Sequence, residues 1–186
     1  MRIVSGVVLA VAIAGSIGES ADWPQWRGPG RNGISSETGL LARWPADGPR
    51  HVRSVVGIGA GYASVVVADG RIFTIGKDKA IVYARAYAEK DGALLWKTRI
   101  GQTGRKALST PTVDGDRVYA LDPDGNLFCL KVADGKVVWT RSFSAEFGGQ
   151  LQNGRGFAES PLIDGKYVIG TPGSAEHTMV KLVKAS

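Results

Sequence analysis

The sequence predicts an all-β protein built from repeated four-stranded units, and two observations carry this prediction. The apolar runs that contain Trp96 and Trp139 each follow an Asp-Gly pair, and the two tryptophans lie 43 residues apart. A second set of Asp-Gly pairs, at positions 69, 114 and 164, separates one apolar run from the next. A period of about 40–50 residues with four strand-like runs per unit is typical of the blades of a β-propeller.

The first 21 residues are predicted to be a signal peptide. Arg2 gives a positive start, and an apolar stretch of about 13 residues runs from Ile3 to Gly15. This stretch is shorter than the roughly 20 residues that a spanning helix needs. We therefore expect export to the periplasm or cell envelope, with cleavage after Ala21. Because Glu19 fits a cleavage site poorly, a signal left uncleaved as a membrane anchor is the alternative, and it would be the chain's one membrane contact.

Residues 22–61 are predicted to form an irregular N-terminal arm rich in Trp, Gly and Pro. The prolines and glycines exclude a long helix. Trp23, Trp26 and Trp44 are large apolar side chains that are costly to leave in water. The arm is therefore expected to pack across the surface of a blade.

Residues 62–186 are predicted to hold about three blades of an incomplete propeller. Asp-Gly pairs between the runs favour tight turns, because both residues tolerate positive φ. A closed propeller needs about 4–8 blades, and the third unit reaches Ser186 before its own tryptophan run, so we expect an N-terminal fragment or a truncated product. The expected strands are Tyr62–Ala68, Arg71–Gly76, Lys79–Tyr87, Leu94–Ile100, Thr110–Val113, Arg117–Leu121, Leu127–Val132, Val137–Phe143, Ala158–Ile163, Tyr167–Thr171 and Met179–Val183.

Charge and cysteine content exclude several classes of function. The net charge is +6, but the basic residues are scattered and form no run of five, so no nucleic-acid partner is expected. The single cysteine, Cys129, lies in a strand pattern and reads as a small buried hydrophobe. No catalytic residue is assigned, and His177, with no second histidine near it, predicts no metal site.

The longest stretch after the arm without a strand pattern, Ser144–Phe157, is the candidate binding loop. By strand order it joins the outer strand of one blade to the inner strand of the next, and it therefore crosses an end face of the propeller, where ligands bind. Arg155 could meet an anionic ligand there or be solvated, and Glu159 could ligate a hard cation or accept backbone hydrogen bonds. The candidate residues of this end face are Gln150, Gln152, Asn153, Arg155 and Glu159.

Two stretches, Ala86–Trp96 and Cys129–Trp139, resemble a repeat of the pyrroloquinoline-quinone-like (PQQ-like) propellers, which usually have eight blades. The repeat has the form Ala-x-Asp-x-x-Thr-Gly-Lys-x-x-Trp, and its tryptophan packs against the neighbouring blade. Both copies lack the Asp of the pattern, since Ala88 and Lys131 stand there. The resemblance implies that the residues that dock the blades are Gly92, Trp96, Gly135 and Trp139.

The run that starts Asp22-Trp-Pro-Gln-Trp and the run that starts Glu159-Ser-Pro resemble a narrower, exported group of planctomycete-type bacteria. This group is similar to the scaffold propeller that assists outer-membrane β-barrel assembly. The resemblance implies an exported, non-catalytic binding or assembly scaffold with protein or peptide partners in the envelope and no cofactor. The alternative is a quinone-dependent alcohol or sugar dehydrogenase that holds PQQ with calcium. A chain with one cysteine cannot supply the vicinal cysteine pair of the larger alcohol-oxidising members.

Overall fold

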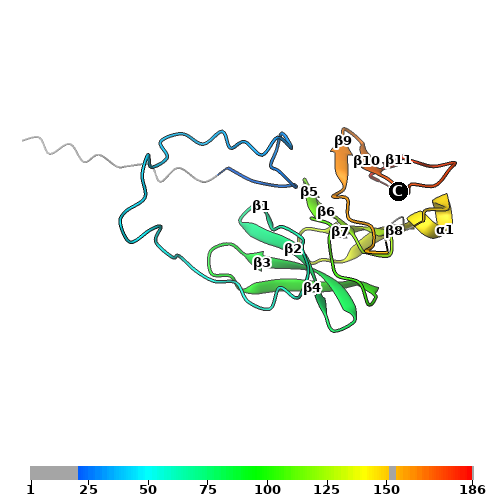
Figure 1. The fold of residues 1–186 in the computed structure, drawn as a ribbon, viewed down its shortest axis with the longest axis horizontal. Coiled ribbons are helices and arrows are strands. Elements are labelled where there is room, and N and C mark those ends of the chain that lie inside the picture. The colour runs from blue at the N-terminus through cyan, green and yellow to red at the C-terminus, as the bar shows by residue number, and fades with distance from the viewer. Residues whose placement is uncertain (1–20, 151–153, 186) are drawn as a thin grey trace, which may run out of the picture.

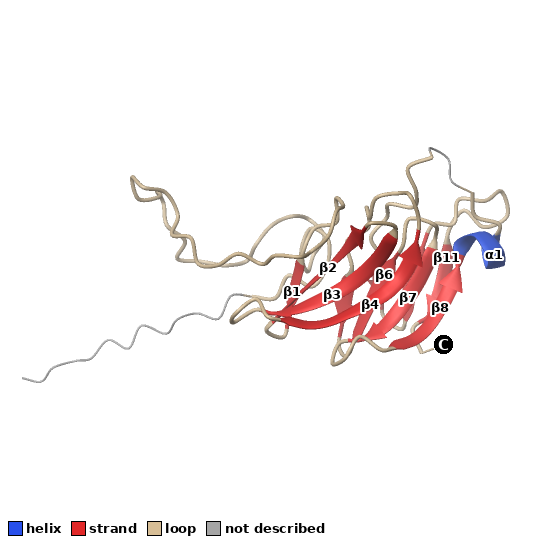
Figure 2. Cartoon of the chain, turned by 90° about the horizontal axis from the view of Figure 1, so that it is seen from below, coloured by secondary structure: helices blue, strands red, loops and turns tan. Residues whose placement is uncertain are grey.

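The computed structural model describes residues 21–150 and 154–185, which form three antiparallel sheets standing side by side (Figures 1 and 2). Strands follow one another in each sheet in chain order, as successive hairpins do. The predicted all-β class is confirmed. No helix in the described part of the chain is long and apolar enough to cross a membrane.

We call the three sheets blades 1, 2 and 3. Blade 1 contains β1 (Val66–Ala68), β2 (Arg71–Asp78), β3 (Ile81–Ala88) and β4 (Leu94–Gln102). Blade 2 contains β5 (Thr112–Asp114), β6 (Arg117–Leu121), β7 (Asn126–Lys131) and β8 (Val137–Ser142). Blade 3 contains β9 (Leu162–Asp164), β10 (Tyr167–Gly170) and β11 (Val180–Val183).

Two apolar cores join the blades face to face. Because successive side chains of a strand point to opposite faces, β6 sends Val118 and Ala120 into the core shared with blade 1. The alternate residues Tyr119 and Leu121 enter the core shared with blade 3. Blade 2 is therefore buried on both faces, which explains its continuous apolar runs.

The first strand of each blade is the innermost, since β5 contacts β1 on one side and β9 on the other. The chain enters these inner strands from one end of the blade array, which we call the cleft end. By the antiparallel order, the Asp-Gly turns at 69–70, 91–92, 114–115, 134–135 and 164–165 lie at the opposite end. These five turns thus occupy one end, and the connections between blades gather at the other, beside the β2–β3 and β6–β7 turns.

One short helix, α1 (Phe143–Phe147), interrupts the candidate binding loop (Figure 2). Ser142 caps it by accepting the N–H of Ala145 at 3.3 Å, and Gly148 ends it in the left-handed region. The strand expected to reach Phe143 ends one residue earlier, because the Phe143 ring turns into the core between blades 2 and 3 and is fully buried.

The first part of the arm runs along the inner strands of all three blades. Trp23 exchanges two backbone hydrogen bonds with Val67, of 2.8 and 3.0 Å, and the carbonyl of Pro24 accepts the N–H of Val113 at 2.8 Å. The guanidinium of Arg31 then donates to two carbonyls that precede β9. The sequence offered no strand pattern here, so this pairing became visible only in three dimensions.

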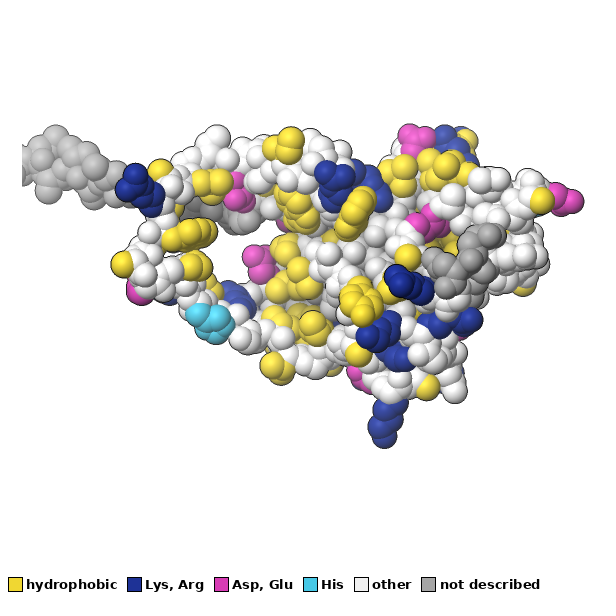
Figure 3. Space-filling view, viewed as in Figure 1, with side chains coloured by type: hydrophobic (Ala, Val, Ile, Leu, Met, Phe, Trp, Pro, Cys, Tyr) yellow, Lys and Arg dark blue, Asp and Glu magenta, His cyan; other side chains and the backbone are white. Residues whose placement is uncertain are grey.

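The rest of the arm loops away from the sheets before it returns to blade 1 (Figures 1 and 3). Trp44 on this loop is 68% exposed, and Trp26 is 45% exposed. The expectation that all three arm tryptophans would be covered is therefore wrong for these two. The returning chain pairs Ala60 with Lys77 through two backbone hydrogen bonds of 2.9 Å.

Candidate functional site

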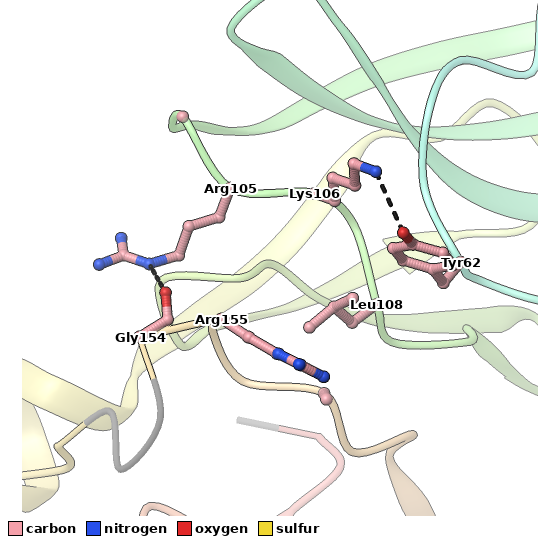
Figure 4. A pocket seen from close by; sticks show the side chains of 8 residues that line it. Tyr62, Arg105, Lys106, Leu108, Gly154 and Arg155 are labelled. Atoms are coloured by element: carbon pink, nitrogen blue, oxygen red, sulfur yellow. Dashed lines mark hydrogen bonds between the residues drawn. The ribbon is translucent and has the colours of Figure 1, made fainter.

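Two adjoining clefts give the cleft end its name. They open at the end of the blade array from which the chain enters the inner strands. The larger, of about 940 Å³, we call the basic cleft, and it lies between the connections that precede β1, β5 and β9 (Figure 4). The smaller we call the apolar cleft. Tyr62, Leu108 and Ala158 line both clefts, so the two form one continuous groove.

The apolar cleft itself measures about 430 Å³. Figure 3 shows Lys and Arg side chains gathered near the middle of the blade array with hydrophobic side chains beside them.

Three cationic side chains line the basic cleft: Arg105 and Lys106 from the β4–β5 connection and Arg155 from the β8–β9 connection. No carboxylate is among its lining residues. Lys106 donates to the hydroxyl of Tyr62 at 3.1 Å, and this bond, together with the positive charge of Lys106, lowers the pKa of Tyr62. The lowered pKa of Tyr62 therefore indicates a positive electrostatic potential in the basic cleft.

A turn of blade 2 holds Arg105 in place. The buried carboxylate of Asp122 accepts the backbone N–H groups of Asp124 and Asn126 at 2.9 and 2.8 Å, which shapes the β6–β7 turn. Asp124 then pairs with the Arg105 guanidinium at 2.7 Å and accepts the hydroxyl of Thr103 at 3.2 Å. Figure 4 shows that Arg105 directs its guanidinium away from Tyr62, toward the carbonyl of Gly154.

The apolar cleft continues the groove toward the arm. Its lining includes Trp26 of the arm and Leu162, Ile169 and Met179 of blade 3. The pKa of Glu159, which also lines it, is raised by burial, an effect that the Thr171 N–H and the positive charge of Arg31 oppose.

Hydroxyl groups tie the three connections together beneath the groove. The N–H of Ser64 donates to the Thr110 hydroxyl at 3.0 Å, and the N–H of Thr110 donates to the Ser160 hydroxyl at 3.1 Å. These bonds link blade 1 to blade 2 and blade 2 to blade 3. The three connections that form the groove are therefore hydrogen-bonded to one another and are not independent loops.

The structure brings two of the five candidate end-face residues into the groove. Arg155 lines the basic cleft and Glu159 the apolar cleft. Gln150 lies elsewhere, in a depression beside α1 with His177. Gln152 and Asn153 fall outside the described residues.

Sequence reasoning missed Tyr62, Arg105 and Lys106. All three lie just before an inner strand, in the connections equivalent to the loop that contains Arg155. Comparing equivalent positions across the repeats, instead of searching one long loop, would have found them.

Three of the four residues expected to dock the blades lie at contacts between neighbouring blades. The Trp96 indole N–H donates to the carbonyl of Val132 in blade 2 at 2.9 Å, and its ring lies against Gly135. The Trp139 indole N–H donates to the carbonyl of Lys184 in blade 3 at 2.8 Å. Gly92 instead faces Val55 of the arm.

The donor set of the groove does not fit calcium. Calcium takes six to eight oxygen ligands, mostly carboxylates, whereas the basic cleft presents cations. Glu159, the carboxylate that the sequence put forward as a cation ligand, accepts the N–H of Thr171 at 2.5 Å. Among the described residues, no three His, Cys, Asp or Glu side chains cluster as a metal site.

Two four-stranded sheets and one three-stranded sheet around a shared inner edge, with a groove at one end, define a propeller repeat domain. Residues 30–182 match the family described as outer membrane protein assembly factor BamB, and the chain belongs to this family of PQQ-like repeat proteins. A curated relative, the outer membrane protein assembly factor BamB of Moranella endobia (strain PCIT), is 32% identical over 88 residues. That match covers 43% of this chain and 22% of the relative, so the chain spans about a fifth of the relative's length.

Solved structures to which the chain is similar include a BamB and two dehydrogenases. BamB from Moraxella catarrhalis has a TM-score of 0.37 at 21% identity, over 62% of this chain and 40% of that one. A europium-containing methanol dehydrogenase has a TM-score of 0.46 at 16% identity, over 62% of this chain and 21% of that one. The quinohemoprotein alcohol dehydrogenase ADHIIG from Pseudomonas putida HK5 has a TM-score of 0.46 at 21% identity, over 62% and 17% of the two chains.

Proposed function

We propose that this chain belongs to an exported, non-catalytic scaffold of the cell envelope that takes part in assembling outer membrane proteins by binding a protein partner. The family match over residues 30–182 carries the proposal. The groove supports the binding role, because it offers one continuous recessed surface at the cleft end. Export rests on the apolar N-terminal stretch of the sequence.

The proposal keeps the division made from the sequence: a signal peptide over 1–21, an arm over 22–61 and propeller blades over 62–186. The arm's hydrogen bonds to β1, to β5 and to the carbonyls just before β9 support a role in bracing the blades. A partner would then meet the groove that the arm borders. No cofactor is required for this role.

The test is removal of the gene from its source organism, followed by quantitative mass spectrometry of the outer membrane fraction. We expect several β-barrel proteins to fall in abundance and to recover when the intact gene is restored. Unchanged levels, together with PQQ- and calcium-dependent dye reduction by the purified protein on adding alcohols or sugars, would replace the scaffold with the dehydrogenase alternative.

A further inference from the structure

We propose that the groove binds an extended acidic peptide segment of the partner, with its carboxylates in the basic cleft and a following apolar side chain in the apolar cleft. This inference rests on the proposed function and names the chemistry of the partner. It is carried by the juxtaposition of a cationic and an apolar half in one continuous groove.

The cationic half favours carboxylates. Lys106 and Arg155 lie on either side of Leu108, and both lower the pKa of Tyr62, as positive charges close to a phenol do (Figure 4). Asp124 pairs with Arg105, so one carboxylate faces the three cations of the lining. The cleft therefore carries a net positive charge, and ion pairs with hydrogen bonds to carboxylates are the strong contacts it can make.

The apolar half is close to neutral. Arg31 donates to the carbonyls of Ser160 and Pro161 at 3.1 Å each and lies near the carboxylate of Glu159, so these two charges offset one another. Met179 is 64% exposed and Leu162 is 37% exposed at this end. An apolar side chain placed here would remove this surface from water, at about 25 cal/mol for each Å² covered.

The hydroxyl bonds beneath the groove fix the two halves relative to each other, so that a ligand can engage both at once. Tyr62, Leu108 and Ala158, which are common to both halves, form the surface over which the peptide would pass. A ligand with only one of the two chemistries would use half of the groove. An extended peptide fits because its side chains reach successive positions along a line.

The experiment measures fluorescence anisotropy of the purified protein with a labelled peptide of three glutamates followed by three leucines. Two matched probes carry the same label: three glutamines with three leucines, and three glutamates with three serines. We expect the first peptide to bind at least tenfold tighter than either matched probe and to weaken as sodium chloride rises, because salt screens exposed charges.

The test variant is Lys106→Gln with Arg155→Gln, which removes two charges and leaves the Arg105–Asp124 pair intact. The control is Lys131→Gln with Lys136→Gln, an equal charge change on exposed residues at the opposite end. We expect the test variant to bind the first peptide at least tenfold more weakly and the control to bind it as the parent does. Circular dichroism of both variants checks that they are folded.

Three results would overturn the inference. They are equal weakening in both variants, equal binding of all three peptides, and full displacement of the peptide by citrate or by PQQ at concentrations below the peptide's own dissociation constant. The proposed function fails separately, through unchanged outer membrane protein levels after gene removal. If those levels fall and the test variant restores them fully, the scaffold stands and the acidic-peptide assignment is wrong.

Discussion

Replacing Gly135 with alanine tests how the blades dock. Gly135 has φ of +69°, and a Cβ built there would lie 2.6 Å from two ring atoms of Trp96 and from the hydroxyl of Thr98. The ring cannot slide away easily, because its N–H is bound to the carbonyl of Val132 at 2.9 Å. The substitution therefore adds overpacking to backbone strain.

A matched control, Gly115→Ala, separates the cost of backbone strain from the cost of overpacking. Gly115, in the Asp-Gly turn between β5 and β6 of blade 2, has φ of +55° and nothing within 4 Å of its Cβ position. Gly115→Ala should lower the free energy of unfolding by about 1–2 kcal/mol, the cost of a left-handed alanine. Gly135→Ala should add about 1–3 kcal/mol for overpacking.

Guanidinium denaturation monitored by circular dichroism measures both variants against the parent. The expected result is a lower midpoint for Gly135→Ala than for Gly115→Ala. A second measurement introduces Gly135→Ala beside Trp96→Leu, where the smaller side chain should remove most of the extra cost. Equal losses for the two glycine variants would refute the claim that close contact with Trp96 sets the cost at Gly135.

Three further predictions follow from single contacts. Trp139→Phe should lower the free energy of unfolding by about 1 kcal/mol, since it removes the hydrogen bond to the carbonyl of Lys184, and denaturation checks this. Burial raises the pKa of the Cys129 thiol to about 11, so iodoacetamide at pH 8 should label it only after denaturation; rapid labelling of the folded protein would contradict its burial. Burial also raises the pKa of Glu159 above its ordinary 4.5; the folded protein therefore holds this proton more tightly than the unfolded one, and stability is lost as pH rises from about 4.5 through the folded pKa. Glu159→Gln should reduce this loss in thermal unfolding between pH 4 and 7, and an unchanged pH profile would count against it.

Much of the fold follows from local chemistry. The Asp-Gly pairs predicted the hairpins because glycine adopts positive φ in tight turns without strain. The β-rich runs between these turns predicted strands, and the observed blades contain strands near each expected position. The helix α1 was missed, because five residues carry too short a pattern to show a helical period.

The groove depended on contacts between residues that are distant in the chain. Lys106 and Tyr62 are 44 residues apart, and Arg105 and Gly154 are 49 apart, yet each pair forms a hydrogen bond. Only the loop that contains Arg155 stood out in the sequence, since its length was unusual. Its two counterparts are short and carried no signal of their own.

The sequence by itself determined the repeat, its turns and its strands, because these depend on residues a few positions apart. The tertiary structure alone decided which connections meet, where the arm lies and which charges share a cleft. These outcomes depend on the packing of one blade against the next, which brings equivalent positions of successive repeats together. The groove is thus a property of the stacked blades and of no single repeat.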